Sequence, residues 1–117
     1  MDMERLLDFT DGDEASLREL IDLYLDQTGK QMDQLGAAVQ AGLSQDVRRV
    51  AHSCAGASAT CGMRRLVPLL RELERQGAED KLTTAPQVYQ DAAKEFDEIR
   101  RFLEGYLASH ANLAGKA

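Results

Sequence analysis

The chain has 117 residues, with 14 lysines and arginines against 20 acidic residues, which gives a formal net charge of -6 at pH 7. This length suits one domain with a single hydrophobic core, so we treat residues 1–117 as one domain. The negative charge argues against nucleic acid and anionic membranes as the main partners.

The termini and the cysteines add further exclusions. The first residues carry acids where a signal peptide carries a basic region, and no stretch approaches the roughly 18 apolar residues of a membrane span. These features predict a cytoplasmic protein or the cytoplasmic piece of a larger one. Cys54 and Cys61 are seven residues apart in one predicted helix. They are therefore about 10 Å apart along its axis, too far for a disulfide. Few other ligands have suitable spacing, so we expect no metal site.

The composition predicts an all-α protein, because it is rich in Leu, Ala, Glu, Gln and Arg and contains only two prolines. A small apolar cluster between Met3 and Phe9 suggests a short N-terminal helix or cap. From about Asp13 to Gly42, apolar residues then recur in steps of three and four, which predicts a long amphipathic helix. These positions are Leu17, Leu20, Ile21, Tyr24, Thr28, Met32, Leu35 and Val39.

Three further helices are predicted. The second begins with Ser44 as its N-cap and runs to about Cys61, where Gly62 ends it. The third contains Leu66 to Leu73, has Pro68 in its first turn and stops at Gly77.

The fourth helix opens with a capping box formed by Thr84 and Gln87 and runs to about Leu107. Residues 109–117 then form a frayed tail. Four helices with short connections predict an antiparallel up-down-up-down four-helix bundle with its core in about residues 13–107.

The second predicted helix carries an outward histidine. His52 lies about 200° around the helix from Val50, which belongs to the apolar face, so the imidazole should face solvent. Its neighbours on the outer face, at spacings of three, four and seven residues, are Arg48, Arg49, Ala55, Gly56 and Ala59. A mid-helix glycine costs about 1 kcal/mol relative to alanine, which suggests that a partner approaches Gly56 closely. Taken singly, the histidine and arginines could also be ordinary surface residues, and Gly56 a helix-crossing point.

The pattern Ala51-His52, Gly56, Ser58 and Gly62 resembles the signature of histidine-phosphotransfer (HPt) domains, and the likeness extends over roughly residues 13–107. It implies that His52 is phosphorylated, while Ser58 and Gly62 have structural roles. Ser58 falls on the inward face, where a serine can bond a carbonyl one turn back.

Two positions depart from the family pattern: Cys54 replaces a leucine, and Ala55 replaces a lysine that is expected to steady the phosphoryl group. We hypothesise that Arg48 or Arg49 supplies the missing charge, since arginine binds phosphate oxygens bidentately. The alternative is that the partner supplies it.

The resemblance implies a phosphorelay intermediate that takes a phosphoryl group from a receiver-domain aspartate and passes it to another receiver. The implied partners are response-regulator receiver domains and a hybrid sensor kinase, with magnesium held by the receiver and no cofactor on this chain. No nucleotide motif occurs, so we expect no ATP-dependent kinase activity.

Docking is expected on Ala55, Gly56 and Ala59 together with the first helix near residues 27–34, with Arg64 and Arg65 as weaker rim candidates. We expect a monomer, because the four apolar stripes can cover one another. The alternative function is a non-catalytic helical adaptor of the same fold.

Overall fold

A computed structural model describes the backbone of residues 13–114 and the side chains of residues 13–109. This part of the chain contains four α-helices and no strand: α2 (Glu14–Ala41), α3 (Ser44–Thr60), α4 (Leu66–Ala78) and α5 (Ala85–Ala114). The all-α prediction is confirmed. The short N-terminal helix or cap expected before Asp13 lies outside the described residues.

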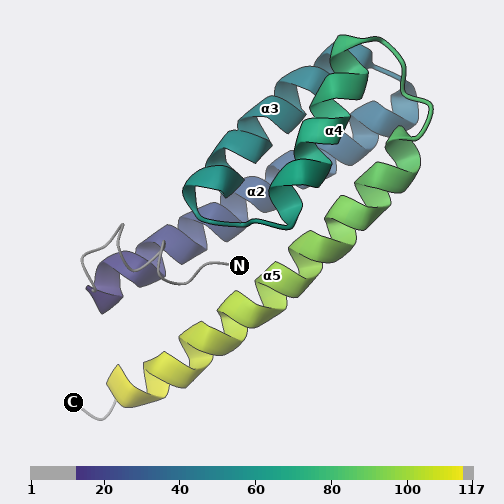
Figure 1. The fold of residues 1–117 in the computed structure, drawn as a ribbon. Coiled ribbons are helices and arrows are strands. Elements are labelled where there is room, and N and C mark those ends of the chain that lie inside the picture. Colours follow the sequence, from purple (N-terminus) through teal and green to yellow (C-terminus); the bar gives the residue numbers. More distant parts are fainter. Residues whose placement is uncertain (1–12, 115–117) are drawn as a thin grey trace.

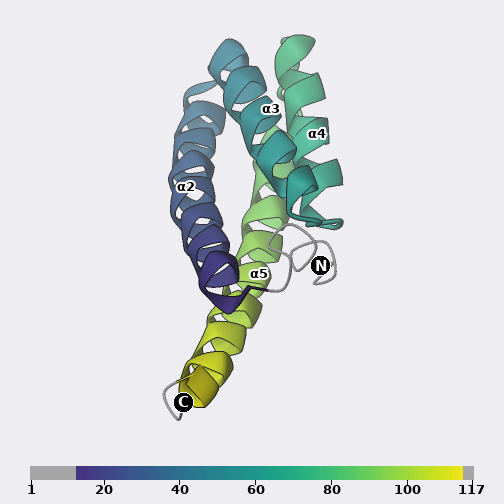
Figure 2. The ribbon, with the colours of Figure 1, turned by 90° about the vertical axis from the view of Figure 1, so that its left-hand side faces the viewer.

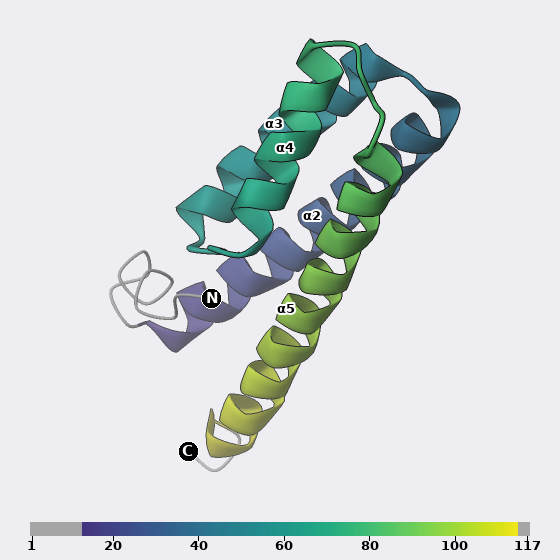
Figure 3. The ribbon, with the colours of Figure 1, turned by 45° about the vertical axis from the view of Figure 1, so that its right-hand side comes forward.

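The helices form an antiparallel bundle in which each element runs opposite to the one before it (Figure 1). Consecutive helices contact each other, and α2 also contacts α5, so the four elements close into a ring around a shared core. Figure 3 shows the short α3–α4 hairpin lying alongside the longer α2 and α5. The predicted up-down-up-down topology is therefore confirmed.

The limits of α2 and α3 follow from local chemistry. Asp13 caps α2, because its carboxylate accepts hydrogen bonds from the Ala15 amide (3.3 Å) and the Ser16 hydroxyl (2.7 Å). Gly42 ends α2 with a φ of 70°, a left-handed conformation that glycine adopts without strain. The prediction that Ser44 caps α3 is wrong. Ser44 is the first helical residue, and its hydroxyl donates instead to Asp80 at the end of α4 (2.5 Å).

Two expected helix ends also differ in the structure. Helix α4 ends at Ala78, one residue beyond the predicted stop at Gly77, and this glycine makes a close contact with α3. Helix α5 runs to Ala114 rather than to about Leu107, and the expected frayed tail from residue 109 is helical through that point. The apolar stripe stops near Tyr106, but the following residues contain no proline or glycine before Gly115, so nothing local breaks the helix.

At the start of α5 the expected capping box is replaced by other bonds. Thr84 accepts a hydrogen bond at Oγ1 from Gln76 (2.7 Å), and Gln87 donates forward to Asp91 (3.1 Å). Pro86 lies in the first turn, as does Pro68 in α4, and in that position a proline disrupts no helical hydrogen bond.

The core contains the predicted apolar stripes and a buried polar contact between α2 and α3. Tyr24 of α2 packs edge-on against Phe96 of α5, with ring centroids 6.4 Å apart, and its hydroxyl lies 2.9 Å from that of Ser58. Both hydroxyls are buried and partnered, as buried polar groups need to be. The largest fully buried apolar side chains are Ile21, Leu35, Met63, Leu66, Leu70, Leu73 and Leu103.

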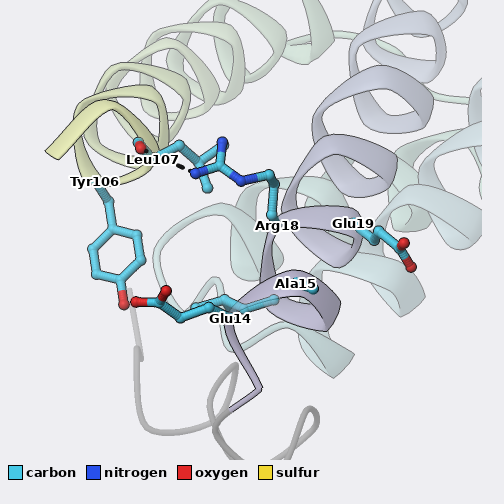
Figure 4. Close-up of a pocket in the computed structure, with 7 residues that line it drawn as sticks. Glu14, Ala15, Arg18, Glu19, Tyr106 and Leu107 are labelled. Carbon is cyan, nitrogen blue, oxygen red and sulfur yellow. Dashed lines mark hydrogen bonds between the residues drawn. The ribbon is translucent and has the colours of Figure 1, made fainter. Parts of the chain in front are cut away.

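Helices α2 and α5 extend beyond the α3–α4 hairpin at one end of the bundle (Figure 2). There a cavity of about 470 Å³ lies between the first turns of α2 and the region of Tyr106 and Leu107 (Figure 4). Arg18 reaches across it, with its guanidinium 3.4 Å from the Leu107 carbonyl oxygen. His52 is not among the residues that line this cavity.

Candidate functional site

His52 projects from the middle of α3 with 67% of its side chain exposed. The predicted outward orientation is confirmed. Its Nδ1 atom lies 2.6 Å from Oε2 of Glu74, which belongs to α4. When Nδ1 carries the ring proton and donates it to this carboxylate, the Nε2 atom on the other edge of the ring keeps its lone pair.

Sequence reasoning missed Glu74, which is 23% exposed and is bonded on both carboxylate oxygens. Oε2 faces His52, while Oε1 accepts a hydrogen bond from the Arg71 guanidinium (2.9 Å). Burial raises the pKa of Glu74, but the hydrogen bonds from Arg71 and His52 outweigh it, so the pKa lies below its ordinary value. Glu74 is therefore an anion at neutral pH. The sequence signal was only an Arg-Glu pair at helical spacing, which alone does not locate a partner on α3.

Close packing of α3 against α4 brings Glu74 to the histidine. A Cβ atom added to Gly77 would lie 2.6 Å from the Ser44 carbonyl oxygen and 2.7 Å from the Arg48 amide nitrogen. Only a residue without a side chain permits this approach of two backbones. Gly77 is one turn beyond Glu74, so it sets the helix separation next to the site.

The small residues around His52 divide into buried and open positions. Ala55 is fully buried, so its predicted role in docking is wrong. Three residues along a helix turn the side chain back by about 60°, which here leads from His52 into the α3–α4 contact. Gly56, four residues after His52, turns about 40° the other way, and a Cβ on it would have no atom within 4 Å. Ala59, seven residues after His52, lies within about 20° of it around the helix and is exposed.

The other signature residues occupy structural positions. Ser58 is fully buried and hydrogen-bonded to Tyr24, which confirms the inward orientation that we predicted. Gly62 follows the C-cap of α3 with a φ of 76°, a left-handed conformation that favours glycine. Cys54 and Cys61 are free and buried. In the described part of the chain, no three His, Cys, Asp or Glu side chains are grouped so as to hold a metal ion.

The two arginines that precede His52 are directed toward the previous turn of α3. Arg48 donates to Gln45 (3.4 Å), and Arg49 lies 3.8 Å from the Asp46 carboxylate. Both side chains are exposed, and their suggested role at a phosphoryl group remains a prediction. Arg64 and Arg65 are also exposed, near the end of α3.

Helix α2 approaches the site from the side opposite to Glu74. Gln31 donates a hydrogen bond to the hydroxyl of Ser53, the residue after His52 (2.9 Å). The expected docking segment of the first helix, residues 27–34, is therefore adjacent to the histidine. Gln27 and Gln34 at its ends are exposed.

An antiparallel four-helix bundle that exposes one carboxylate-bonded imidazole in the middle of its second helix has the architecture of a histidine-phosphotransfer domain. Residues 19–107 match the Hpt domain family, and the chain belongs to that family. It is also similar to the crystal structure of histidine-containing phosphotransfer protein B (HptB) from Pseudomonas aeruginosa PAO1. The two share 27% sequence identity and a TM-score of 0.85, over 91% of this chain and 92% of that chain.

No similar sequence was found among curated proteins. Family membership and the likeness to HptB support a histidine-phosphotransfer intermediate of a phosphorelay, a class of protein that interacts with receiver domains and kinases. None of the described helices combines the length and the apolar character needed to cross a bilayer.

Proposed function

We propose that His52 is the phosphoryl acceptor and donor of this phosphorelay intermediate, taking the group from one receiver-domain aspartate and passing it to another. The observation that carries this proposal is the exposed imidazole whose Nδ1 atom lies 2.6 Å from Glu74. This contact favours the tautomer in which Nε2 is unprotonated and nucleophilic. The histidine in the Hpt family pattern falls on the same residue.

In the forward step, the Nε2 lone pair attacks the phosphorus of the aspartyl phosphate. The new N–P bond forms as the P–O bond to the aspartate breaks, and that electron pair leaves with the carboxylate. The ring becomes positively charged, and the Glu74 carboxylate at Nδ1 stabilises this charge. In the reverse step, the N–P electron pair returns to the imidazole when a second aspartate attacks. We expect the magnesium ion to be held by the receiver, with no cofactor on this chain.

We further propose that receiver domains dock over Gly56 and Ala59 and the adjacent residues 27–34 of α2. The open space above Gly56 supports this placement, because a surface without a side chain lets a partner approach the imidazole. We also propose that one partner is a hybrid sensor kinase that carries such a receiver. The chain is proposed to be monomeric and cytoplasmic.

The assignment is tested by incubating the chain with a phosphorylated receiver and measuring acid-labile, base-stable label. The chain has two histidines, so His110→Gln is the matched control for His52→Gln. We expect the control to keep the label and His52→Gln to lose it. Label that persists on His52→Gln contradicts the assignment. Receiver binding without any label on the wild type would favour the adaptor alternative, and label from ATP alone would contradict the absence of kinase activity.

Glu74→Gln tests the orienting carboxylate. The amide can still occupy the space but lacks the negative charge that stabilises the ring cation, so transfer should slow by about tenfold, typical of one charge-assisted hydrogen bond. Glu72→Gln is the control, because Glu72 lies on the same helix and bonds Arg75 rather than His52. Equal rates for the two variants would remove Glu74 from the mechanism.

The docking surface is tested with Gly56→Leu against Gly105→Leu. Both glycines are helical, and a Cβ on either would have no atom within 4 Å, so each position has room for the first atom of a side chain. Gly56→Leu should weaken receiver binding because its side chain lies beside His52, whereas Gly105→Leu should not. Titration calorimetry measures both affinities. Unchanged affinity for Gly56→Leu would place the docking surface elsewhere.

A further inference from the structure

We infer that Arg71 of α4 is the cation that binds the phosphoryl group on His52, in place of the lysine that the family pattern has at Ala55. This inference rests on the proposed function of His52. It names a residue on the opposite helix from the two arginines suggested by the sequence.

The first argument is proximity. One carboxylate separates the guanidinium from the imidazole: Arg71 lies 2.9 Å from Oε1 of Glu74, and His52 lies 2.6 Å from Oε2. The Arg71 side chain is 45% exposed, so its remaining donors are open to solvent and to an incoming group. A guanidinium carries five N–H donors, and the bond to Glu74 engages only one of its terminal nitrogens.

The second argument is the register of the two antiparallel helices. Ser44 contacts Asp80 and His52 contacts Glu74, so moving toward the C-terminus of α3 means moving toward the N-terminus of α4. Arg71 therefore lies opposite the turn of α3 that contains Ala55. Ala55 is small and fully buried, so this turn of α3 carries no cation of its own, and Arg71 is the basic residue opposite it on α4.

The third argument is electrostatic. A phosphoryl group carries close to two negative charges near neutral pH, and on His52 it would be near the ionised Glu74. The charged ring offsets part of this repulsion, and a second cation beside both anionic groups offsets more of it. Arg71 already bonds that carboxylate, whereas Arg48 and Arg49 contact the preceding turn of their own helix. Arg71 can bridge Glu74 and the phosphoryl oxygens by charge-assisted hydrogen bonds.

The test follows the equilibrium of label between a phosphorylated receiver and the full chain. Arg71→Ala should lower the ratio of phosphohistidine to phosphoaspartate by about tenfold, and Arg71→Lys should recover part of it, because lysine keeps the charge but not the planar fork. Arg75→Ala is the control, since Arg75 lies on the same helix and pairs with Glu72 and Glu79. The control should leave the ratio unchanged.

A spectroscopic readout separates contact from mere support of the fold. The ³¹P resonance of phosphohistidine should shift in Arg71→Ala but not in Arg75→Ala, while urea denaturation should show similar stability for both variants. An unshifted resonance together with an unchanged label ratio overturns the inference.

A second background tests whether Arg71 acts only by holding Glu74. If Arg71 binds the phosphoryl group, Arg71→Ala should lower the ratio further when introduced into Glu74→Gln. If Arg71→Ala does not lower the ratio of phosphohistidine to phosphoaspartate any further in that background, the inference is overturned. It is also overturned if the ratio falls only in the double variant Arg48→Ala/Arg49→Ala. Failure of the proposed function has a different signature, namely label that persists on His52→Gln.

Discussion

Gly77→Ala is the substitution that most directly tests how α3 and α4 hold the site. The added methyl group would lie 2.6 Å from the Ser44 carbonyl oxygen and 2.7 Å from the Arg48 amide nitrogen. Both atoms belong to the backbone, so no side-chain rotation relieves the contact and the two helices must separate. Overpacking of this kind costs about 1–3 kcal/mol. Alanine recovers at most about 1 kcal/mol of helix propensity, so the net effect should be destabilising.

The matched control is Gly105→Ala in α5, where a Cβ would have no atom within 4 Å. There the propensity gain is unopposed, and the free energy of unfolding should rise by about 0.5–1 kcal/mol. Urea denaturation of both variants gives the comparison. Gly77→Ala should also slow labelling of His52, because separation of the helices moves Glu74 away from the ring. A Gly77→Ala protein as stable as Gly105→Ala would refute this account of the α3–α4 contact.

Three further outcomes concern buried or paired groups. Ser58→Ala should cost about 1–3 kcal/mol because it removes a buried hydrogen-bond partner of the Tyr24 hydroxyl. Adding Tyr24→Phe should recover part of that loss in a double-mutant cycle by urea denaturation. Burial raises the pKa of Cys54 to about 11 and also raises the pKa of Cys61. Both thiols should therefore resist alkylation at pH 8 until the protein unfolds. The free energy of unfolding should fall as the pH rises from 9 toward 11, because the thiols lose their protons more readily in the unfolded chain. Hydrogen bonds that outweigh burial lower the pKa of Glu74, so its stabilising contribution should be present above about pH 4.5 and be lost on acidification, and Glu74→Gln should flatten this part of the stability profile.

The helices were predictable because their apolar spacing repeats along the chain. The stripe from Leu17 to Val39 and the terminating Gly42 correspond to α2, and the outward His52 follows from the same periodicity in α3. The end of α5 was missed because an apolar stripe can stop while the backbone continues. Its last residues up to Ala114 contain no helix-breaking residue, so the helix extends beyond the stripe.

The glycines were harder to interpret from the sequence. Gly77 has the position of a helix terminator in the sequence, yet it lies inside α4 against the backbone of α3. Gly56 is also a glycine within a helix, but it faces open space. Only the path of the neighbouring helix distinguishes a glycine that permits packing from one that keeps a surface clear.

Helical periodicity is a local property of the chain, so an all-helical bundle with an exposed histidine in its second helix could be predicted from the residue pattern. The side chains that surround this histidine could not be predicted in that way. Glu74 and Arg71 reach His52 through the register and close packing of two antiparallel helices, and the same packing buries Ala55. Register depends on contacts between residues far apart in the sequence, which local spacing does not specify.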